Sequence, residues 1–465
     1  MPDFAHPYLQ KIFANPPQNQ ALIYQDHSYT YATLLQKVQT QIDRLSCVRS
    51  GACLAIVGDY DINSIAMLLA GIEKNLILVP LSEANDNDEK FSLAQVAFVY
   101  QNNTLTPHAQ NTPKHPLLQD LQDTSAGGLV LFSSGSTGTP KAIVHHLNRL
   151  LDGYLDKKHK PITILLFLMF DHIGGLNTLF NTLAMGACGV GIHDRKNIDS
   201  LAKTIQDYQI SLLPASPSLL NLMLLAGVQK RYDLSSLKII TYGTEQMPST
   251  LLSRLKKAFV KVKFHQTFGA SEVGIAQTKS FQNAIKIEGM AYKIIDGELY
   301  LHSPTRAMGY LNASNAVFDE EGYFATGDLV EVIQKDNQEF IKIIGRTKEI
   351  INVGGEKVLP QEIEEVIFEI KGIKDCVVVG EKNPITGQSV TLKVVVDEDI
   401  LDPKDKIGLK KLIREFCRSR LQSYKIPTKV MVLKDLPTTE RFKKARMPKN
   451  SDILNVGNID RFSHP

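Results

Sequence analysis

Short apolar runs alternate with amphipathic stretches from Ala21 to about Leu201, and this alternation restricts the possible fold more than any other feature of the chain. The segment ACLAIVGDYDINSIAMLLAGIEKNLILVPL, residues 52–81, has the pattern of a strand, a helix and a second strand. The runs GGLVLF, ITILLFLMF and ACGVGIH are bounded by turn residues, as is typical of strands that are buried on both faces. The alternation predicts an open, mostly parallel sheet with helices packed on it.

The pattern changes near residue 290 and again after Gly345. The segments YKIIDGELYLHSP and DLVEVIQKDNQEFIKIIG predict β-hairpins with Asp-Gly and Asp-Asn at their turns. Beyond Gly345, helical patterns in EIEEVIFEI and KIGLKKLIREFCRSRL flank the strand-like runs DCVVVGE and VTLKVVVDE. We predict an α/β protein with a large N-terminal domain, residues 1–345, that has mostly parallel sheets, helices and a β-rich subdomain. A small mobile α+β domain, residues 346–465, would follow.

Composition and charge exclude several classes of protein. The 465 residues carry a formal net charge of only +3, so no strong global field favours nucleic acid or an anionic membrane. The five cysteines are scattered without a C-x-x-C pair, which argues against a disulfide framework or a zinc site and suits a reducing compartment. No apolar run approaches the roughly 18 residues of a membrane span, and the N-terminus lacks a secretion-signal pattern. We expect a cytoplasmic protein without a membrane span or a nucleic-acid partner.

The stretch SSGSTGTPKAIVHH, residues 133–146, follows an apolar run and contains only glycine and hydroxyl residues before Pro140 and Lys141. Such a loop can aim backbone N–H groups at phosphate oxygens, while its hydroxyls add donors and Lys141 adds a positive charge. A flexible surface linker is the alternative, but linkers seldom follow an apolar strand. The motif G-x-x-x-x-G-K-[ST] needs a lysine directly after glycine, whereas Thr139 and Pro140 intervene here. The loop predicts phosphate binding, but not a GTPase or a P-loop ATPase.

This loop resembles the phosphate loop of the AMP-forming adenylate synthetases. That superfamily comprises acyl- and aryl-CoA ligases, the adenylation domains of peptide synthetases, and firefly luciferase. Its other motifs have counterparts across nearly the whole chain, namely TYGTEQMP, QTFGASEVG, YFATGDLV, IIGRTKEIINVGGEKVLPQEIEEVI, LQSYKIPTKV and LPTTERFKKAR. The fourth is the most specific, because it follows Gly-Arg-x-x-[Asp/Glu]-x-Ile-x-x-x-Gly-x-x-Val-x-Pro-x-Glu-Ile-Glu nearly residue for residue.

The resemblance implies how these motifs bind ATP and Mg²⁺. The ring of Phe268 would lie against adenine, Ser271 near the phosphates and Glu272 on Mg²⁺, for which a carboxylate is a suitable ligand. Asp328 and Arg346 would contact the ribose hydroxyls. The full set implied for the nucleotide is Ser133, Ser134, Gly135, Ser136, Thr137, Gly138, Thr139, Lys141, Gly243, Thr244, Glu245, Phe268, Gly269, Ser271, Asp328, Arg346 and Lys348.

The closing motif implies a catalytic lysine. Its pattern, Pro-x-Thr-x-x-Gly-Lys-x-x-Arg, places Lys443 at the catalytic position, with neighbouring Lys444 as the alternative. The family glycine before this lysine is Phe442 here, and a phenylalanine would be strained if that position needs a positive φ. The residues implied in catalysis are Lys443, Glu272, Thr137 and His172, with Glu272 also the metal ligand.

The implied reaction has two steps. A carboxylate attacks the α-phosphorus of ATP, which releases pyrophosphate and leaves an acyl-adenylate, and a thiol then attacks the mixed anhydride and releases AMP. The reacting anions repel each other, so the site has to supply positive charge. Lys443 would supply part of it from the C-terminal domain, and would leave before the thiol arrives by rotation of that domain about a hinge at Lys348.

Two segments of the chain bear on the identity of the acid. The stretch FLMFDHIGGLNTLF, residues 167–180, resembles the segment beside the acyl pocket, where His172 would gate a tunnel, orient the carboxylate or serve only the structure. Peptide-synthetase adenylation domains have an aspartate after a phenylalanine in this segment, which pairs with the amino group of their substrate, and Phe170-Asp171 matches that pattern. The following HIGGL, however, is typical of acyl- and aryl-CoA ligases. Together with the apolar LPASPSLLNLML, residues 213–224, this favours a fatty or aryl acid. The thiol would be CoA or the phosphopantetheine of a carrier protein.

Two alternatives stay open. The chain would be a stand-alone adenylation enzyme for an amino acid and a carrier protein, or a non-catalytic nucleotide-binding member whose chemistry was lost through Phe442. Exchange of labelled pyrophosphate into ATP distinguishes these readings, because only an active enzyme exchanges label in the presence of its acid.

Overall fold

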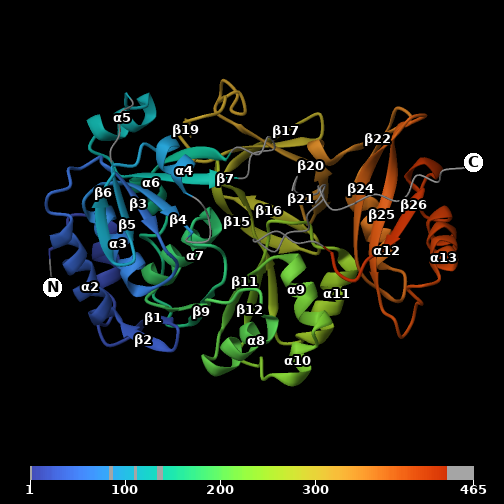
Figure 1. Cartoon of the computed structure of the whole chain (residues 1–465), viewed down its shortest axis with the longest axis horizontal. Helices are drawn as coiled ribbons and strands as arrows, with labels where there is room; N and C mark the ends of the chain where they lie inside the picture. The colour runs from blue at the N-terminus through green and yellow to red at the C-terminus, as the bar shows by residue number, and fades with distance from the viewer. Residues whose placement is uncertain (1–2, 83–86, 109–112, 134–139, 437–465) are drawn as a thin grey trace, which may run out of the picture. The chain divides into compact units, whose positions relative to one another are not determined.

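The computed structural model describes residues 3–82, 87–108, 113–133 and 140–436 (Figure 1). The chain divides into two compact units. The first comprises Met1–Thr244 and Leu255–Ile343, and the second comprises Glu245–Arg254 and Ile344–Pro465. The helix α11 (Ser249–Ala258) therefore begins in the second unit and ends in the first.

One sheet of the first unit is largely parallel. Its strands are, in spatial order, β13 (Lys263–Gln266), β12 (Ile239–Tyr242), β11 (Leu212–Ala215), β9 (Thr163–Leu166), β10 (Cys188–Gly191), β1 (Gln20–Tyr24) and β2 (His27–Thr30). All neighbours pair in parallel except β1 and β2, which form a hairpin. The strand expected in ITILLFLMF is shorter than predicted, because β9 ends at Leu166. The next two carbonyls, of Phe167 and Leu168, accept hydrogen bonds from the side chains of Arg195 and Tyr60.

A second sheet of the first unit leads into and out of the glycine-rich loop. Its order is β19 (Gly309–Tyr310), β8 (Lys141–His146), β7 (Gly128–Ser133), β4 (Ile77–Leu81), β3 (Cys53–Val57), β5 (Phe98–Gln101) and β6 (Thr104–Pro107). The central strands from β7 to β5 are parallel, and antiparallel strands extend both edges. Every residue of β3 and β4 is buried, as expected for strands covered on both faces.

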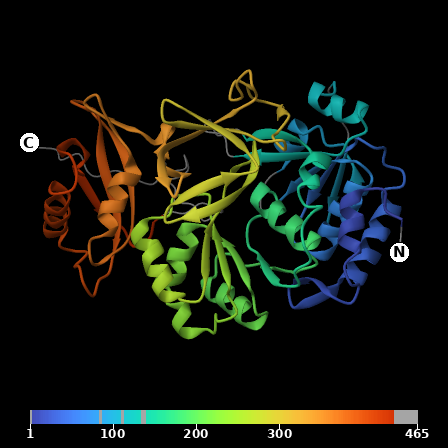
Figure 2. The ribbon, with the colours of Figure 1, turned by 180° about the vertical axis from the view of Figure 1, so that it is seen from behind.

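Helices surround the strands of the first unit (Figures 1 and 2). Helix α3 (Ile62–Glu73) is buried along most of its length, and its N-cap Asp61 accepts hydrogen bonds from the Asn63 and Ser64 N–H groups. Helix α2 (Tyr31–Arg44) is amphipathic and buries Leu34 and Val38 in the same core. The helices are α1 (Pro7–Phe13), α2 (Tyr31–Arg44), α3 (Ile62–Glu73), α4 (Asp88–Leu93), α5 (Pro116–Asp123), α6 (Leu147–Asp152), α7 (Ile173–Ala184), α8 (Ile198–Asp207), α9 (Pro217–Leu225) and α10 (Val228–Arg231).

The third sheet is the β-rich part expected after residue 290, and it also includes Phe268–Ala270 and Gly274 of the motif QTFGASEVG. Its order is β14 (Phe268–Ala270), β15 (Gly274–Phe281), β16 (Ala284–Glu288), β21 (Gln338–Arg346), β20 (Phe324–Lys335), β18 (Glu298–His302) and β17 (Ala291–Ile295). The expected Asp-Gly and Asp-Asn turns are present, with positive φ at Asp296, Gly297, Asp336 and Asn337.

The second unit has its own sheet and core. The strands β23 (Glu356–Val358), β22 (Ile351–Val353), β25 (Gly387–Val396) and β24 (Ile373–Asn383) lie in this order, and β26 (Lys429–Val432) also pairs with β25. The helices α12 (Pro360–Phe368) and α13 (Lys406–Arg418) add apolar side chains to that core. Short 3₁₀ helices span Thr347–Glu349 and Ser423–Lys425. The predicted α/β class, with its mostly parallel sheets, β-rich part and small α+β part, is confirmed.

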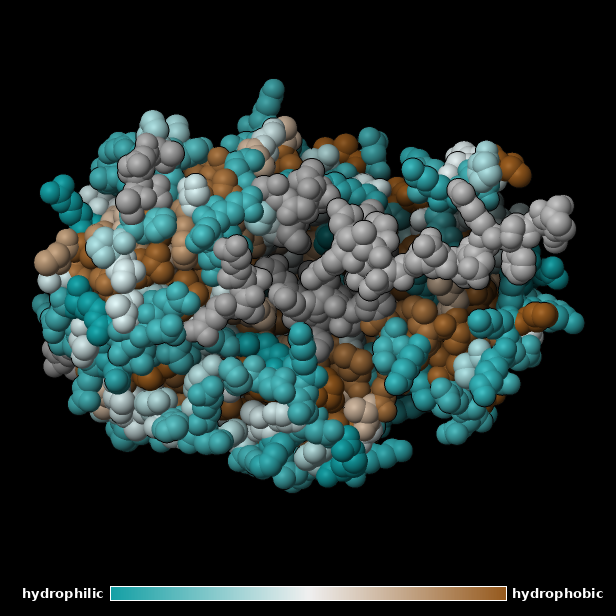
Figure 3. Space-filling view, in the orientation of Figure 1, coloured by the Kyte–Doolittle hydropathy of each residue, from teal (hydrophilic) through white to brown (hydrophobic). Residues whose placement is uncertain are grey.

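Hydrophilic residues predominate on the face drawn in Figure 3, where apolar residues form separate patches. No helix within the described part of the chain is long and apolar enough to span a bilayer.

Candidate functional site

Predicted site residues follow the carboxyl ends of two neighbouring parallel strands. β12 ends at Tyr242 and is followed by Gly243 and Thr244, while Phe268 comes shortly after β13. The Thr267 N–H donates to the Tyr242 carbonyl at 2.8 Å and ties these ends together. A Cβ on Gly243 would lie 2.6 Å from Thr267 Oγ1, so the close approach requires glycine. The structure thus brings Gly243, Thr244 and Phe268 to the sheet edge where open α/β folds bind ligands.

Ser271 and Glu272 lie in the turn of a tight hairpin. β14 ends at Ala270, β15 begins at Gly274, and the two strands pair antiparallel. A Cβ on Gly269 would lie 2.3 Å from the Gly274 carbonyl oxygen, so only glycine permits this approach of the strands. The Ser271 and Glu272 residues are both half-buried. The hairpin therefore carries a hydroxyl and a carboxylate at adjacent positions.

Tyr310 joins Glu272 to the lysine of the glycine-rich loop. Its hydroxyl donates to Glu272 Oε1 at 2.8 Å, and Lys141 Nζ lies 5.4 Å from the centroid of its ring. Burial, followed by the charge of Glu272, raises the pKa of Tyr310 well above its usual value, so the hydroxyl keeps its proton and acts as the donor. Sequence reasoning missed Tyr310, which the β19–β8 pairing brings beside Lys141.

The surroundings of Glu272 fit a magnesium ion that is shared with a nucleotide. The neutral Tyr310 hydroxyl donates a hydrogen bond to one oxygen of the Glu272 carboxylate. This bond orients the carboxylate and leaves its negative charge in place. No cluster of three or more His, Cys, Asp or Glu side chains suited to a metal occurs among the described residues. Mg²⁺ usually binds through one or two carboxylates together with substrate phosphates, so a single well-oriented glutamate is compatible with it.

The glycine-rich loop joins two antiparallel strands rather than a strand and a helix. Ser133, the last residue of β7, pairs with Lys141, the first residue of β8. The Asn312 side chain accepts from the Ala142 N–H and donates to the Pro140 carbonyl, which fixes the chain where it leaves the loop. Among the described residues on either side of the loop, Lys141 is the one that carries a positive charge for a phosphate. Outside the described residues lie Ser134, Gly135, Ser136, Thr137, Gly138 and Thr139.

His145 lies directly behind the Glu272 hairpin. The side chain is fully buried, and this burial lowers the pKa of His145 to about 4. Backbone groups of Ser271 and Thr305 beside the ring act in the opposite direction and raise the pKa, but the effect of burial is larger. His145 is therefore neutral near pH 7 and fills the space behind the hairpin without adding charge. His145 belongs to the stretch SSGSTGTPKAIVHH, but nothing in the sequence indicates that its side chain packs behind the Glu272 hairpin.

Asp328 lies within β20, in the third sheet. Its residue is buried, and its N–H donates to Thr326 Oγ1 at 3.0 Å. Gly327 has a φ of +73°, and its N–H donates to Glu298 Oε1 at 2.9 Å rather than continuing the regular ladder. The Thr-Gly-Asp stretch is therefore a local irregularity of the strand, which is where side chains are turned away from the regular pleat.

His172 is the N-cap of α7. Its Nδ1 accepts from the Gly174 N–H at 3.1 Å, so the neutral ring carries its proton on Nε2. The imidazole is half-buried and is therefore a hydrogen-bond donor of fixed tautomer.

Three predicted residues that the structure describes belong to the second unit. Glu245 begins the segment that groups with it, Arg346 ends β21, and Lys348 is the middle residue of the 3₁₀ turn that follows. Arg346 and Lys348 are exposed. Lys443 lies outside the described residues.

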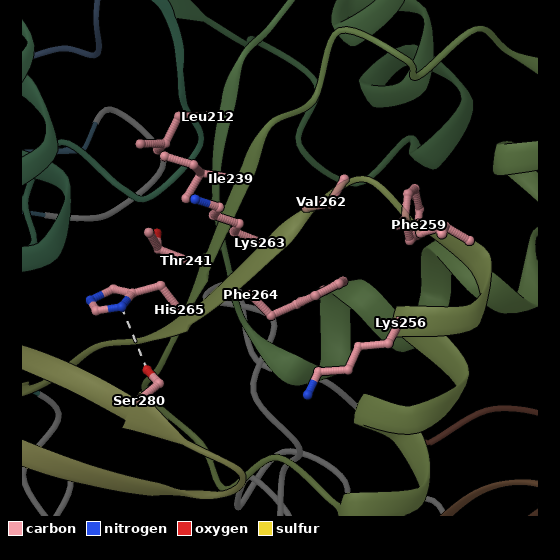
Figure 4. A pocket seen from close by; sticks show the side chains of 11 residues that line it. Leu212, Ile239, Thr241, Lys256, Phe259, Val262, Lys263, Phe264, His265 and Ser280 are labelled. Atoms are coloured by element: carbon pink, nitrogen blue, oxygen red, sulfur yellow. Dashed lines mark hydrogen bonds between the residues drawn. The ribbon is translucent and has the colours of Figure 1, made fainter.

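A pocket of about 780 Å³ lies towards the amino-terminal ends of β11, β12 and β13. Figure 4 draws the side chains that line it. Leu212, Ile239 and Lys263, which line it, are the first residues of β11, β12 and β13. His265 in its wall lies 3.5 Å from Ser280 Oγ, as the dashed line marks. Thr241, the first residue of the motif TYGTEQMP, lines this pocket, but none of the predicted site residues that the structure describes does.

Family models match both parts of the chain. The model described as AMP-binding enzyme matches residues 84–311, and the model described as AMP-binding enzyme C-terminal domain matches residues 362–443. The 2-succinylbenzoate–CoA ligase of Listeria monocytogenes is 24% identical over 93% of this chain and 96% of its own length. The 4-coumarate–CoA ligase of Pinus taeda is 27% identical over 66% of this chain and 62% of its own length.

Solved structures share the fold. An anthranilate CoA ligase in complex with anthranoyl-AMP superposes with a TM-score of 0.80 at 17% identity, covering 96% of each chain. The o-succinylbenzoate CoA synthetase of Bacillus subtilis, in complex with its acyl-adenylate, gives a TM-score of 0.72 at 20% identity, covering 99% of this chain and 100% of that one. Fold and relatives define the class as an AMP-forming acid–thiol ligase. The chain belongs to the AMP-binding enzyme family, and the predicted resemblance is confirmed.

Proposed function

We propose that this ligase activates an aryl carboxylic acid with ATP and transfers the acyl group to CoA. The names of the similar proteins support an aryl acid, because they specify 2-succinylbenzoate, 4-coumarate and anthranilate. The observation that carries the proposal is the cluster of Lys141, Tyr310 and Glu272 at the mouth of the glycine-rich loop. A cation and an oriented carboxylate that share one neighbour support this proposal, because a triphosphate and its metal need both kinds of group.

In the first step, a carboxylate oxygen of the acid forms a bond to the α-phosphorus of ATP as the bond to pyrophosphate breaks. Lys141 would offset the phosphate charge, and the Nε2–H of His172 would donate to the acid and orient it. Mg²⁺ on Glu272 would neutralise phosphate oxygens when bound. In the second step, the thiol gives up its proton to water, its sulfur forms a bond to the acyl carbon, and AMP leaves with the electron pair of the broken anhydride bond.

The assignments of Lys443 and Thr137 rest on the order of the motifs. One positioned electrostatic contact contributes about 100- to 1,000-fold in rate. Lys443→Ala should therefore lower adenylation by that factor and leave ATP binding nearly unchanged, while Lys444→Ala serves as the matched control. If Lys444→Ala shows the larger loss, the catalytic lysine is the neighbour.

The deciding experiment is exchange of labelled pyrophosphate into ATP with benzoate, 2-aminobenzoate, 2-succinylbenzoate, 4-coumarate, decanoate and phenylalanine. We expect exchange with an aryl acid and, after addition of CoA, an acyl-CoA that mass spectrometry detects. Exchange with phenylalanine alone would favour the amino-acid adenylation reading. ATP binding without exchange for any acid would favour the non-catalytic reading suggested by Phe442.

The proposed place of the reaction is the cytoplasm. All five cysteines are free thiols, as is usual for proteins of a reducing compartment.

A further inference from the structure

The loop between β9 and α7, residues 167–172, is held by side chains from two other strand ends. The Tyr60 hydroxyl donates to the Leu168 carbonyl at 2.8 Å, and Arg195 Nε donates to the Phe167 carbonyl at 2.9 Å. Tyr60 follows β3 of the second sheet, whereas Arg195 follows β10 of the first. The loop is therefore fixed against both parallel sheets of the first unit at once.

Asp59 fixes Arg195 in turn. The two side chains form a bidentate pair, with Nη1–Oδ2 and Nη2–Oδ1 distances of 2.7 Å each. The arginine side chain is 13% exposed and that of Asp59 is 24% exposed, so the pair is largely withdrawn from water. A planar fork held at both oxygens has little freedom to rotate, so the direction of the remaining Nε–H is set as well. The Arg195 guanidinium also lies 5.9 Å from the centroid of the Tyr60 ring.

The loop is also closely packed. The fully buried Tyr60 ring meets the Phe170 ring edge to face, with centroids 5.6 Å apart at 89°. A Cβ on Gly175, in the first turn of α7, would lie 2.0 Å from the Met169 carbonyl oxygen and 2.5 Å from the Tyr60 hydroxyl. Hydrogen bonds, ring packing and the absence of space for a methyl group all specify the same loop conformation.

The last residue of this loop is His172, whose ring is held by its cap on α7. The position of its Nε2–H therefore depends on where the loop delivers the start of the helix. We propose that Asp59, Tyr60 and Arg195 are positioning residues for acid binding. They act through the loop to set where His172 meets the acid, and none of them reacts. This inference rests on the proposed function.

The test compares Tyr60→Phe and Arg195→Lys with the wild type in the pyrophosphate exchange assay. Tyr60→Phe keeps the ring packing and removes only the donor to Leu168, while Arg195→Lys removes the fork and the Nε–H. We expect each variant to raise the KM for the acid about tenfold, as when a buried carbonyl loses its donor. The KM for ATP and the exchange rate at saturating acid should change less than twofold. Arg231→Lys, in an exposed pair with Asp199, is the matched control and should change nothing.

A second measurement separates positioning from general stability. Hydrogen–deuterium exchange should be faster in the peptide containing residues 167–172 of both variants and unchanged in that of Arg231→Lys. The inference is overturned if kcat falls and the KM values for the acid and ATP both rise together with a lower melting temperature. It is also overturned if the KM for the acid does not change. A wild-type protein that activates no acid would instead overturn the proposed function, and that outcome is visible before any variant is made.

Discussion

Removal of a single hydroxyl tests the link between Tyr310 and Glu272. In Tyr310→Phe the ring stays between β8 and the hairpin, while the 2.8 Å hydrogen bond to Glu272 Oε1 is lost. Nothing else in the described surroundings changes size, so the variant isolates the orientation of the carboxylate. Because the raised pKa of Tyr310 keeps the hydroxyl protonated, the wild-type donor is present throughout the working pH range.

The size of the effect follows from the kind of hydrogen bond. A bond to a charged acceptor contributes about 1.5–3 kcal/mol, which corresponds to about 10- to 150-fold in an equilibrium constant. Loss of a group that orients a metal ligand typically costs about 10- to 100-fold in metal affinity. Glu272 is only half-buried, so water can replace part of the lost bond. We therefore expect Tyr310→Phe to weaken binding of the divalent ion about tenfold.

Two measurements examine this expectation. The exchange rate is titrated with Mg²⁺ at saturating acid and ATP, and binding of Mn²⁺ is followed by electron paramagnetic resonance with a non-hydrolysable ATP analogue. Tyr292→Phe is the matched control, because it removes an equally long 2.8 Å bond from Tyr292 to Glu339 at an exposed site.

High Mg²⁺ should restore Tyr310→Phe to nearly the wild-type rate. If Tyr310→Phe binds Mn²⁺ as tightly as Tyr292→Phe does, or if high Mg²⁺ leaves its rate low, Glu272 is not the metal ligand that Tyr310 orients.

Three further predictions concern other parts of the chain. Lys348→Pro fixes φ at the proposed hinge and should slow thioester formation at least tenfold more than pyrophosphate exchange, since the proposed domain rotation precedes only the thiol step; equal losses would disprove the hinge. Gly175→Ala should cost about 1–3 kcal/mol and lower the melting temperature because of its contact with the Met169 carbonyl. Gly153→Ala, whose Cβ would have its nearest neighbour at 3.6 Å, should leave that temperature unchanged. Burial raises the pKa of Cys53 to about 12, so iodoacetamide should modify exposed Cys47 in the native protein and Cys53 only after unfolding, as mass spectrometry would show; equal native rates would contradict the packing of β3.

The strands of the parallel sheets were well predicted because their signal is local. Runs such as CLAIV in β3 and ILVPL in β4 are apolar throughout, and a strand buried on both faces requires that pattern wherever it lies in a sheet. The end of β9 was not predictable in this way. Its apolar run continues into the loop, where Arg195 and Tyr60 donate to the carbonyls of Phe167 and Leu168.

The same distinction holds for the site. Gly243 and Gly269 were found through their motifs, and the structure supplies the reason for glycine in two close backbone approaches. Tyr310 escaped notice because it is 38 residues from Glu272 in a turn-rich segment without periodic pattern. Asp59 and Arg195 are 136 residues apart, and each is an ordinary charged residue until the strands bring them together.

The sequence alone determined the class of fold, the family and the order of the chemical motifs, because each depends on residues that are close together along the chain. Tertiary structure alone decided which side chains hold those motifs in place. Partners such as Tyr310 with Glu272, or Arg195 with the loop before His172, come from strands distant in sequence, and only the paired sheets bring their donors and acceptors within bonding distance.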